Sequence, residues 1–175
     1  HAHSSPHGTP ETGPDVLNPD ADWLAGWTVF TMPGEWTLEV SLPGGDGTPI
    51  DGGAIRFDVA ESGRASSFVD GGERRYHLSL VEPAEPVTGQ NELVISLHRA
   101  ESATDFRPVE DAVIGMEPWM PSMGHGSEGN NDPEHVENGF YSGEVNFNMT
   151  GDWEIRLQIS IGEMEPVEQV FELTF

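Results

Sequence analysis

From about residue 74 to its end, the chain alternates apolar and polar residues with a period of two. In NELVISLHRA, Leu93, Ile95 and Leu97 fall on one face of an extended segment, and DWEIRLQISI and EPVEQVFELTF continue the pattern. Such alternation predicts strands with one buried face. Gly, Pro and Asp interrupt the pattern at short intervals, and no stretch has a convincing helical period. We therefore expect an all-β chain, with six or seven strands of an antiparallel β-sandwich in this region.

Two segments far apart in the chain align without gaps. Residues 22–40, DWLAGWTVFTMPGEWTLEV, match residues 139–157, GFYSGEVNFNMTGDWEIRL, and both contain Phe-x-Met-x-Gly-x-Trp. A strand, a turn that admits Gly and a Trp that opens the next strand would explain the pattern in both places. We interpret it as an internal repeat, although a common hairpin type met twice would give the same letters.

The repeat predicts the organisation of the chain. Residues 1–60 are expected to form a His-rich tail and a partial repeat with an additional β-hairpin region, residues 61–75 a linker, and residues 76–175 a complete sandwich. The partial repeat corresponds only to the second half of a sandwich, and three strands cannot bury two faces alone. Either the N-terminal hairpin packs against the complete domain, or another copy of the chain supplies the missing strands.

The charge of the chain excludes one class of partner. The chain has 31 Asp and Glu but only seven basic residues, all Arg, and its formal net charge is −24. Such a chain repels the phosphates of nucleic acids and anionic membrane surfaces, so nucleic acid is not expected as a partner. The absence of Lys beside so many carboxylates suggests a protein kept soluble in concentrated salt, and a halophilic source is our leading explanation.

Several other classes of site are also not expected. Cys is absent, which removes disulfides and thiolate metal sites. No apolar run approaches the roughly 20 residues that span a bilayer, so no membrane span is expected in this chain. Ser122 lies near His125 but has no nucleophile elbow or triad around it, and no phosphate loop or dinucleotide fingerprint occurs, so we do not expect an enzyme. The chain starts at His1, which removal of a leader would explain, as would a trimmed chain; a periplasmic, cell-surface or extracellular location is expected.

Methionine and histidine gather between residues 115 and 149, which hold four of the six Met and two of the seven His. Thioethers are neutral, polarizable donors that suit Cu(I), and imidazole binds both oxidation states of copper. Prolines and glycines in this segment predict a bent loop from which the sulfur atoms converge. The predicted ligands are Met120, Met123 and His125, with Met116, His135 or Met149 to complete the site.

Some of these residues also have structural interpretations. Met149 and Met116 fall in or at the end of predicted strands, where Met commonly fills a core. His135 can equally be a surface residue. Met120, Met123 and His125 lie where burial is hard to arrange, which favours ligation for these three.

The N-terminal HAHSSPHG contributes His1, His3 and His7. If His1 is a free terminus, its amine, two backbone amides and the His3 imidazole can surround Cu(II) or Ni(II) in a square plane. His1 could instead chelate through its own amine and ring. The same histidines also fit a solvated tail or a tag remnant.

The segments MEPWMPSMGHG and DPEHVENGFYSGEVNFNMTGDWEIRLQI resemble the YtkA/FixH-like domain family. Its pattern of Met-Pro-x-Met-x-His, a later Gly-x-Tyr-x-Gly and a closing Met-x-Gly-x-Trp matches residues 120–125, 139–143 and 149–153. The resemblance covers about residues 76–175. It implies a small extracytoplasmic β-sandwich, immunoglobulin-like or cupredoxin-like, linked with copper handling or with the assembly of copper-containing respiratory enzymes. Family members are often membrane-anchored, and the lack of an anchor here favours a secreted or periplasmic copper binder.

Two hypotheses follow for the function. In the first, the chain is an exported copper carrier, scavenger or assembly factor that holds Cu(I) at the Met/His loop. The N-terminal His segment is then a candidate Cu(II) site, and a copper-receiving protein is a candidate partner. In the second, it is an acidic structural subunit that assembles with other copies of itself through the incomplete first repeat.

Overall fold

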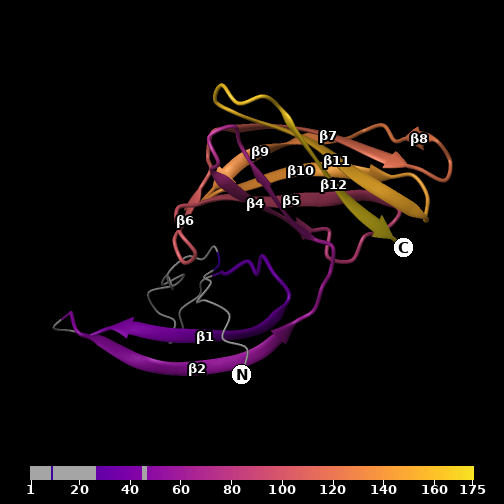
Figure 1. Ribbon diagram of the computed structural model, residues 1–175. Helices are drawn as coiled ribbons and strands as arrows, with labels where there is room; N and C mark the ends of the chain where they lie inside the picture. The colour runs from indigo at the N-terminus through magenta and orange to yellow at the C-terminus, as the bar shows by residue number, and fades with distance from the viewer. Residues whose placement is uncertain (1–8, 10–26, 45–46) are drawn as a thin grey trace. The chain divides into compact units, whose positions relative to one another are not determined.

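A computed structural model (Figure 1) describes residues 9, 27–44 and 47–175. All the regular secondary structure in this part of the chain is β-strand. The all-β prediction is thus confirmed. The strands are β1 (Gly34–Pro43), β2 (Pro49–Val59), β3 (Ala65–Val69), β4 (Arg75–Glu82), β5 (Gly89–Ala100), β6 (Phe106–Pro108), β7 (Ala112–Met120), β8 (His125–Gly126), β9 (Asn131–Glu137), β10 (Phe140–Phe147), β11 (Asp152–Ile161) and β12 (Val167–Thr174).

The larger of the two compact units is an antiparallel β-sandwich. It comprises Gly63–Phe175 together with the described residues up to Thr31. One sheet has the order β3-β4-β5-β10-β9, with β6 also paired to β5, and the other has the order β12-β11-β7-β8. The two sheets form the layers seen in Figure 1. This architecture matches the sandwich expected from the period-two pattern.

The core of the sandwich follows the alternation in the sequence. On β5, Leu93, Ile95 and Leu97 are fully buried, whereas Glu92 between two inward positions is exposed. The same phase on β11 buries Trp153, Ile155, Leu157 and Ile159. Each sheet therefore contributes one apolar face, and burial of these faces supplies the main favourable free energy of folding.

The sandwich begins earlier than the sequence predicted. The expected linker, residues 61–75, contains β3, which pairs with β4 from Ala65 opposite Ser79 to Val69 opposite Arg75. Phe68 is buried, and its ring stacks on that of Tyr76 with the centroids 5.1 Å apart. Because β3 is short and rich in Ser, its alternation was too weak to distinguish it from a linker.

A two-residue turn joins β9 to β10 and positions β10 against β5. Asn138 and Gly139 have positive φ values of 50° and 76°, the backbone of the tight hairpin turn that Asn-Gly favours. An added Cβ at Gly139 would lie 2.5 Å from the carbonyl oxygen of Leu97, so only Gly fits this close approach. β10 then runs along β5 and ends at the turn that leads to β11.

The smaller unit, residues Met32–Ser62, is the hairpin of β1 and β2. Trp36 donates its indole N–H to the carbonyl oxygen of Met32 at 3.0 Å, and Gly34 has a φ of 125°. The N-terminal hairpin expected from the sequence is therefore present. Of the strand that the repeat predicts before it, the described residues 27–31 show only an isolated bridge at Thr28.

Candidate metal site

One half of the candidate site is the tight turn between β7 and β8. The carbonyl oxygen of Met120, the last residue of β7, accepts hydrogen bonds from the N–H groups of Met123 and Gly124, at 3.2 and 2.8 Å. Gly124 has a φ of 68°, which glycine adopts without steric cost. His125 then pairs with Met120 across the turn. The turn thus places Met123 near its apex, where the side chain is 61% exposed.

The other half is the turn between β10 and β11, which contains Met149. Trp153 is buried at the start of β11, and its indole N–H donates to the carbonyl oxygen of Met149 at 3.0 Å. Gly151 has a φ of 144°, a conformation that L residues rarely adopt. The indole bond anchors the turn to the core while the side chain of Met149 stays 38% exposed.

Specific contacts hold the two turns together at one end of the sandwich, beside β8 in Figure 1. Ser122 donates its backbone N–H to the Asp152 carboxylate at 3.1 Å, and its hydroxyl donates to the same carboxylate. The hydroxyl bond lowers the pKa of Asp152, which keeps this acceptor ionised. Beneath the turns, Met120 packs on Gly151 so closely that an added Cβ there would lie 2.6 Å from the Met120 methyl carbon.

His125 has a defined tautomer in this arrangement. Its Nδ1 lies 2.8 Å from the carbonyl oxygen of Gly126, and because a carbonyl only accepts, Nδ1 carries the proton. With the proton on Nδ1, a metal ion would bind at the lone pair of Nε2, as in metal-binding histidines whose other nitrogen donates to a backbone carbonyl. The ring also lies edge-on to Trp153, with the centroids 6.3 Å apart. His125 is therefore oriented by both turns.

The structure brings four of the predicted ligand residues to this end of the sandwich. We call these four residues the Met/His cluster: Met123, His125 and Met149, with Met120 beneath them. Met120 is only 2% exposed, because it has the inward phase of Ile114 on β7. Its thioether forms a packed floor, whereas the other three side chains are at least partly exposed. Two thioethers and one imidazole form a neutral, soft donor set that suits Cu(I).

Met116 and His135 lie away from the cluster. Met116 is in the middle of β7 and packs against the core, four residues before Met120, or about 13 Å along a strand. His135 is exposed on β9, with its ring edge-on to Tyr141 at 5.3 Å. From Tyr141, β10 continues to Phe147 before the Met149 turn begins, a further distance of about 20 Å. The structure does not bring these two residues to the other candidates.

The predicted Cu(II) ligands His1, His3 and His7 lie outside the described residues. Among residues 9, 27–44 and 47–175, no group of three or more His, Asp or Glu side chains could hold a metal ion.

Sequence reasoning missed the residues that support the cluster. Ser122 and Asp152 join the two turns, and the carbonyl of Gly126 fixes the His125 tautomer. Nothing in the sequence pairs Ser122 with a carboxylate thirty positions away. Trp153 was recognised as part of the repeated turn, but its contact with His125 depends on the pairing of β7 with β11.

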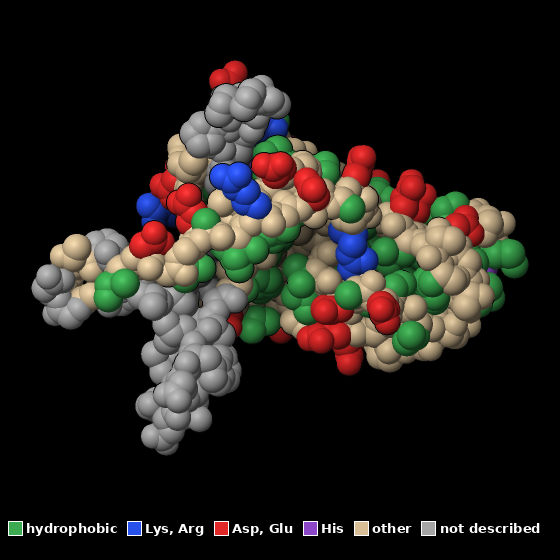
Figure 2. All heavy atoms as spheres, turned by 90° about the horizontal axis from the view of Figure 1, so that it is seen from below, with side chains coloured by type: hydrophobic (Ala, Val, Ile, Leu, Met, Phe, Trp, Pro, Cys, Tyr) green, Lys and Arg blue, Asp and Glu red, His purple; other side chains and the backbone are tan. Residues whose placement is uncertain are grey.

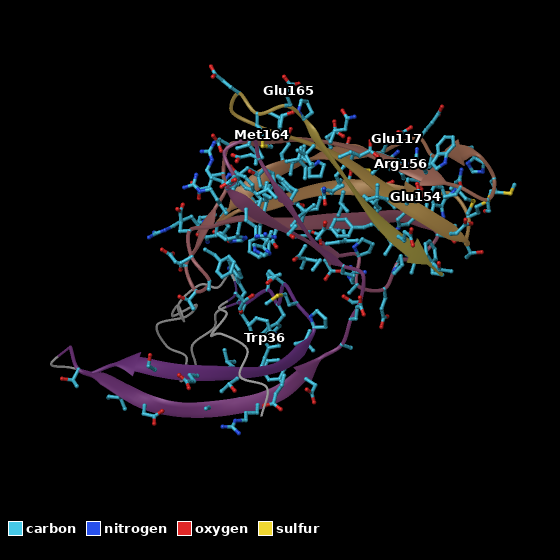
Figure 3. The ribbon with its side chains drawn as sticks, viewed as in Figure 1. Trp36, Glu117, Glu154, Arg156, Met164 and Glu165 are labelled. Atoms are coloured by element: carbon cyan, nitrogen blue, oxygen red, sulfur yellow. The ribbon has the colours of Figure 1, made fainter. Side chains whose placement is uncertain are left out.

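The surface around the fold is mainly acidic. Figure 2 shows Asp and Glu side chains spread over the visible face, with Lys or Arg in only a few places. Arg156, labelled with Glu117 and Glu154 in Figure 3, lies 2.7 Å from the Glu154 carboxylate and 5.0 Å from the centre of the Trp119 ring. Its charge is therefore paired within the protein. The net field of such a surface attracts cations and repels anions.

A match to a known protein family covers most of the sandwich. The model of the family described as YtkA-like matches residues 71–158, half of the chain, and this range contains the whole Met/His cluster. No curated protein and no solved structure matches the chain. Among the described residues, no helix has the length and apolar character that crossing a membrane requires.

Proposed function

Because the chain belongs to the YtkA-like family, we propose that it is an exported copper-binding protein that holds Cu(I) at the Met/His cluster. In this role it is a carrier, a scavenger or an assembly factor that passes copper to a copper-receiving protein, and it is not an enzyme. The family resemblance supports copper handling, and the lack of Cys in the chain leaves Met and His as its soft donors.

One observation carries the proposal. Two turns that lie thirty positions apart are held together by the Ser122–Asp152 contacts, so the exposed side chains of Met123 and Met149 and the imidazole of His125 lie at the same end of the sandwich. The His125 tautomer leaves Nε2 as its free donor. Because Met123 and Met149 are exposed, their thioethers are accessible to a metal ion from solvent.

The donor set also supports a preference for the reduced ion. Neutral thioethers stabilise Cu(I), whereas Cu(II) favours nitrogen and oxygen donors in a square plane. We assign Cu(II), if the chain binds it, to the N-terminal segment with His1, His3 and His7. An extracytoplasmic location and a salt-rich habitat fit a chain with a net charge of −24 and no Lys.

A Cu(I) titration against a competing chelator tests the proposal. The measurement uses reductant and a concentrated salt whose anion does not bind Cu(I), and compares the wild type with the triple variant Met123→Ala/His125→Ala/Met149→Ala. We expect the triple change to weaken binding by a factor of about 100 or more, or about 2.7 kcal/mol. All three side chains are at least partly exposed, so the variant should remain folded, which circular dichroism checks.

The matched control is Met32→Ala/His135→Ala, which removes the same residue types at exposed positions outside the cluster. Met32 is 39% exposed, close to the value for Met149. This control should bind Cu(I) as the wild type does. Equal, weak binding by the wild type and the triple variant would refute the cluster as a copper site.

A second candidate function rests on the β1–β2 hairpin. The segment that leads into β1 repeats the indole bond of the Met149 turn, with Trp36 donating to Met32 at 3.0 Å. On the apolar face of the hairpin, Val40 and Ile55 are exposed. On β11, by contrast, the corresponding face is buried and the second edge pairs with β7. These features support the alternative of an acidic subunit whose first repeat is completed by a neighbouring chain.

Light scattering in molar salt separates the two candidates. A monomer with about one bound copper supports the copper carrier. Assemblies that form without metal and disappear in the variant Val40→Thr/Ile55→Thr support the structural subunit. Those substitutions keep β-branched side chains on the hairpin, so they weaken the apolar face and not the strand propensity.

A further inference from the structure

We propose that Asn148, in the turn between β10 and β11, is the attachment site of an N-linked glycan. Asn148, Met149 and Thr150 form Asn-x-Thr, the acceptor pattern for glycan transfer to the asparagine amide of exported proteins. The chain has seven asparagines, and only Asn148 has Ser or Thr two positions later. The pattern therefore selects one position.

The turn around Asn148 is accessible to a modifying enzyme. The side chains of Asn148, Met149 and Thr150 are all exposed, and the three residues lie between β10 and β11, outside both hydrogen-bonded ladders. A glycan on Asn148 would extend into solvent and would displace no core residue. Surface turns of this kind are where such acceptors function.

The side-chain amide of Asn148 is also available for the reaction. Four other asparagines use their side-chain N–H groups in hydrogen bonds within the fold, namely Asn91, Asn130, Asn131 and Asn146. Within the described part of the chain, Asn148 makes no side-chain hydrogen bond. Substitution at its Nδ2 would therefore break no hydrogen bond among the described residues.

The proposed reaction uses a lipid-linked sugar phosphate as the donor. The Nδ2 of Asn148 forms a bond to C1 of the sugar, and the bond between C1 and the phosphate oxygen breaks. The lipid phosphate leaves with that electron pair, and one proton of Nδ2 passes to a base of the transferase. No oxidant or reductant is needed.

The position of the glycan has a consequence that rests on the proposed function. The middle residue of the acceptor pattern is Met149, an exposed member of the Met/His cluster. A glycan on the adjacent residue would cover this side of the cluster and leave its donors unchanged. It would thereby slow the exchange of Cu(I) with a copper-receiving protein.

Mass spectrometry of the chain isolated from the extracytoplasmic fraction of its own cells tests the glycan. The peptide with Asn148 should carry added sugar mass, Asn148→Gln and Thr150→Val should lose it, and Thr150→Ser should keep it. The control Asn130→Gln should keep the glycan on Asn148. Recovery of only unmodified Asn148, or of a glycan that persists in Thr150→Val, would overturn the proposal.

The rate of Cu(I) transfer to a chelator tests the consequence separately. The glycosylated chain should release Cu(I) more slowly than Asn148→Gln, which keeps every member of the cluster. Equal rates would overturn the screening role and leave the modification site standing. If neither chain binds Cu(I), the proposed function fails, whereas the mass spectrum still decides the glycan.

Discussion

Replacing His98 with Leu should remove a pH dependence of stability that the structure assigns to this one imidazole. His98 lies on β5 and is 3% exposed, with the rings of Trp27 and Phe140 edge-on to it at 5.7 and 6.5 Å. Among the residues that the structure describes, its Nδ1 has no hydrogen-bond partner. The pKa of His98 is lowered to about 4, mainly by burial and also by the charge of His77, against the opposing effect of a hydrogen bond with the backbone of Asn138.

The sign of the effect follows from the direction of this shift. An ordinary histidine has a pKa of about 6.5, so the unfolded chain takes up the proton more readily than the folded one. The contribution of His98 to the free energy of unfolding is therefore complete above pH 6.5 and declines as the pH falls toward 4. Over the whole window the loss is about 3 kcal/mol, at about 1.4 kcal/mol for each pH unit.

Denaturant unfolding between pH 7 and pH 5 measures this effect. The lower limit of pH 5 avoids the poor solubility expected near the isoelectric point of about 4.2. The many carboxylates also change stability with pH, but they are common to both chains, so the difference between wild type and His98→Leu isolates the imidazole. This difference should change by about 2 kcal/mol between pH 7 and pH 5.

A control and a refuting result complete the test. His135 is exposed on β9, so His135→Leu should follow the wild-type pH profile. A wild-type minus His98→Leu difference that stays constant within about 0.5 kcal/mol from pH 7 to pH 5 would refute the reasoning. It would mean that His98 is solvated in the folded protein, and that the Trp27 contact does not shield it from water.

Three further predictions concern the Met/His cluster and the acidic surface. Gly151→Ala should lower the free energy of unfolding, measured with denaturant, by about 1–3 kcal/mol. The φ of 144° at this position strains any other residue, and the added Cβ would displace Met120. Ser122→Ala should weaken Cu(I) binding by about 10- to 100-fold with little change in stability, because it removes a hydroxyl that orients the two turns. An unchanged Cu(I) affinity would contradict this role of the Ser122–Asp152 contact. Raising NaCl from 0.1 to 1 M should increase the unfolding temperature, because the screening length falls from about 10 Å to about 3 Å and the acidic side chains behind the net charge of −24 repel one another less. A calorimetric midpoint that stays constant would contradict this.

The part of the fold with strong alternation could be predicted from the sequence. Segments such as NELVISLHRA repeat apolar residues every second position over a whole strand, so both the element and its inward face were predictable. β3 was missed because Ser occupies two of its five positions and only Phe68 is buried. β6 and β8 have three and two residues, too few to show a period.

The candidate site was predictable in its chemistry but not in its geometry. The spacing of Met123 and His125 within one short segment indicated a soft donor loop, and the Met-x-Gly-x-Trp pattern indicated the second turn. Which methionines converge depends on the pairing of β7 with β11, a contact between distant parts of the chain. For the same reason the sequence could not show that Met120 would have the inward phase of β7.

The acidic surface and the Met/His cluster imply two different kinds of cation binding. The surface charge attracts any cation, but in molar salt the screening length is about 3 Å, so this attraction is weak and unselective. The cluster contains thioethers and an imidazole, and the Cu(I) binding that we propose for it would come from coordination bonds that act at contact distance. Under the proposed function, donors without charge would therefore let the cluster select copper in concentrated salt. On this argument the Cu(I) affinity should stay within a factor of about three when a non-coordinating salt is raised from 0.1 to 2 M, whereas binding through carboxylates would weaken steeply.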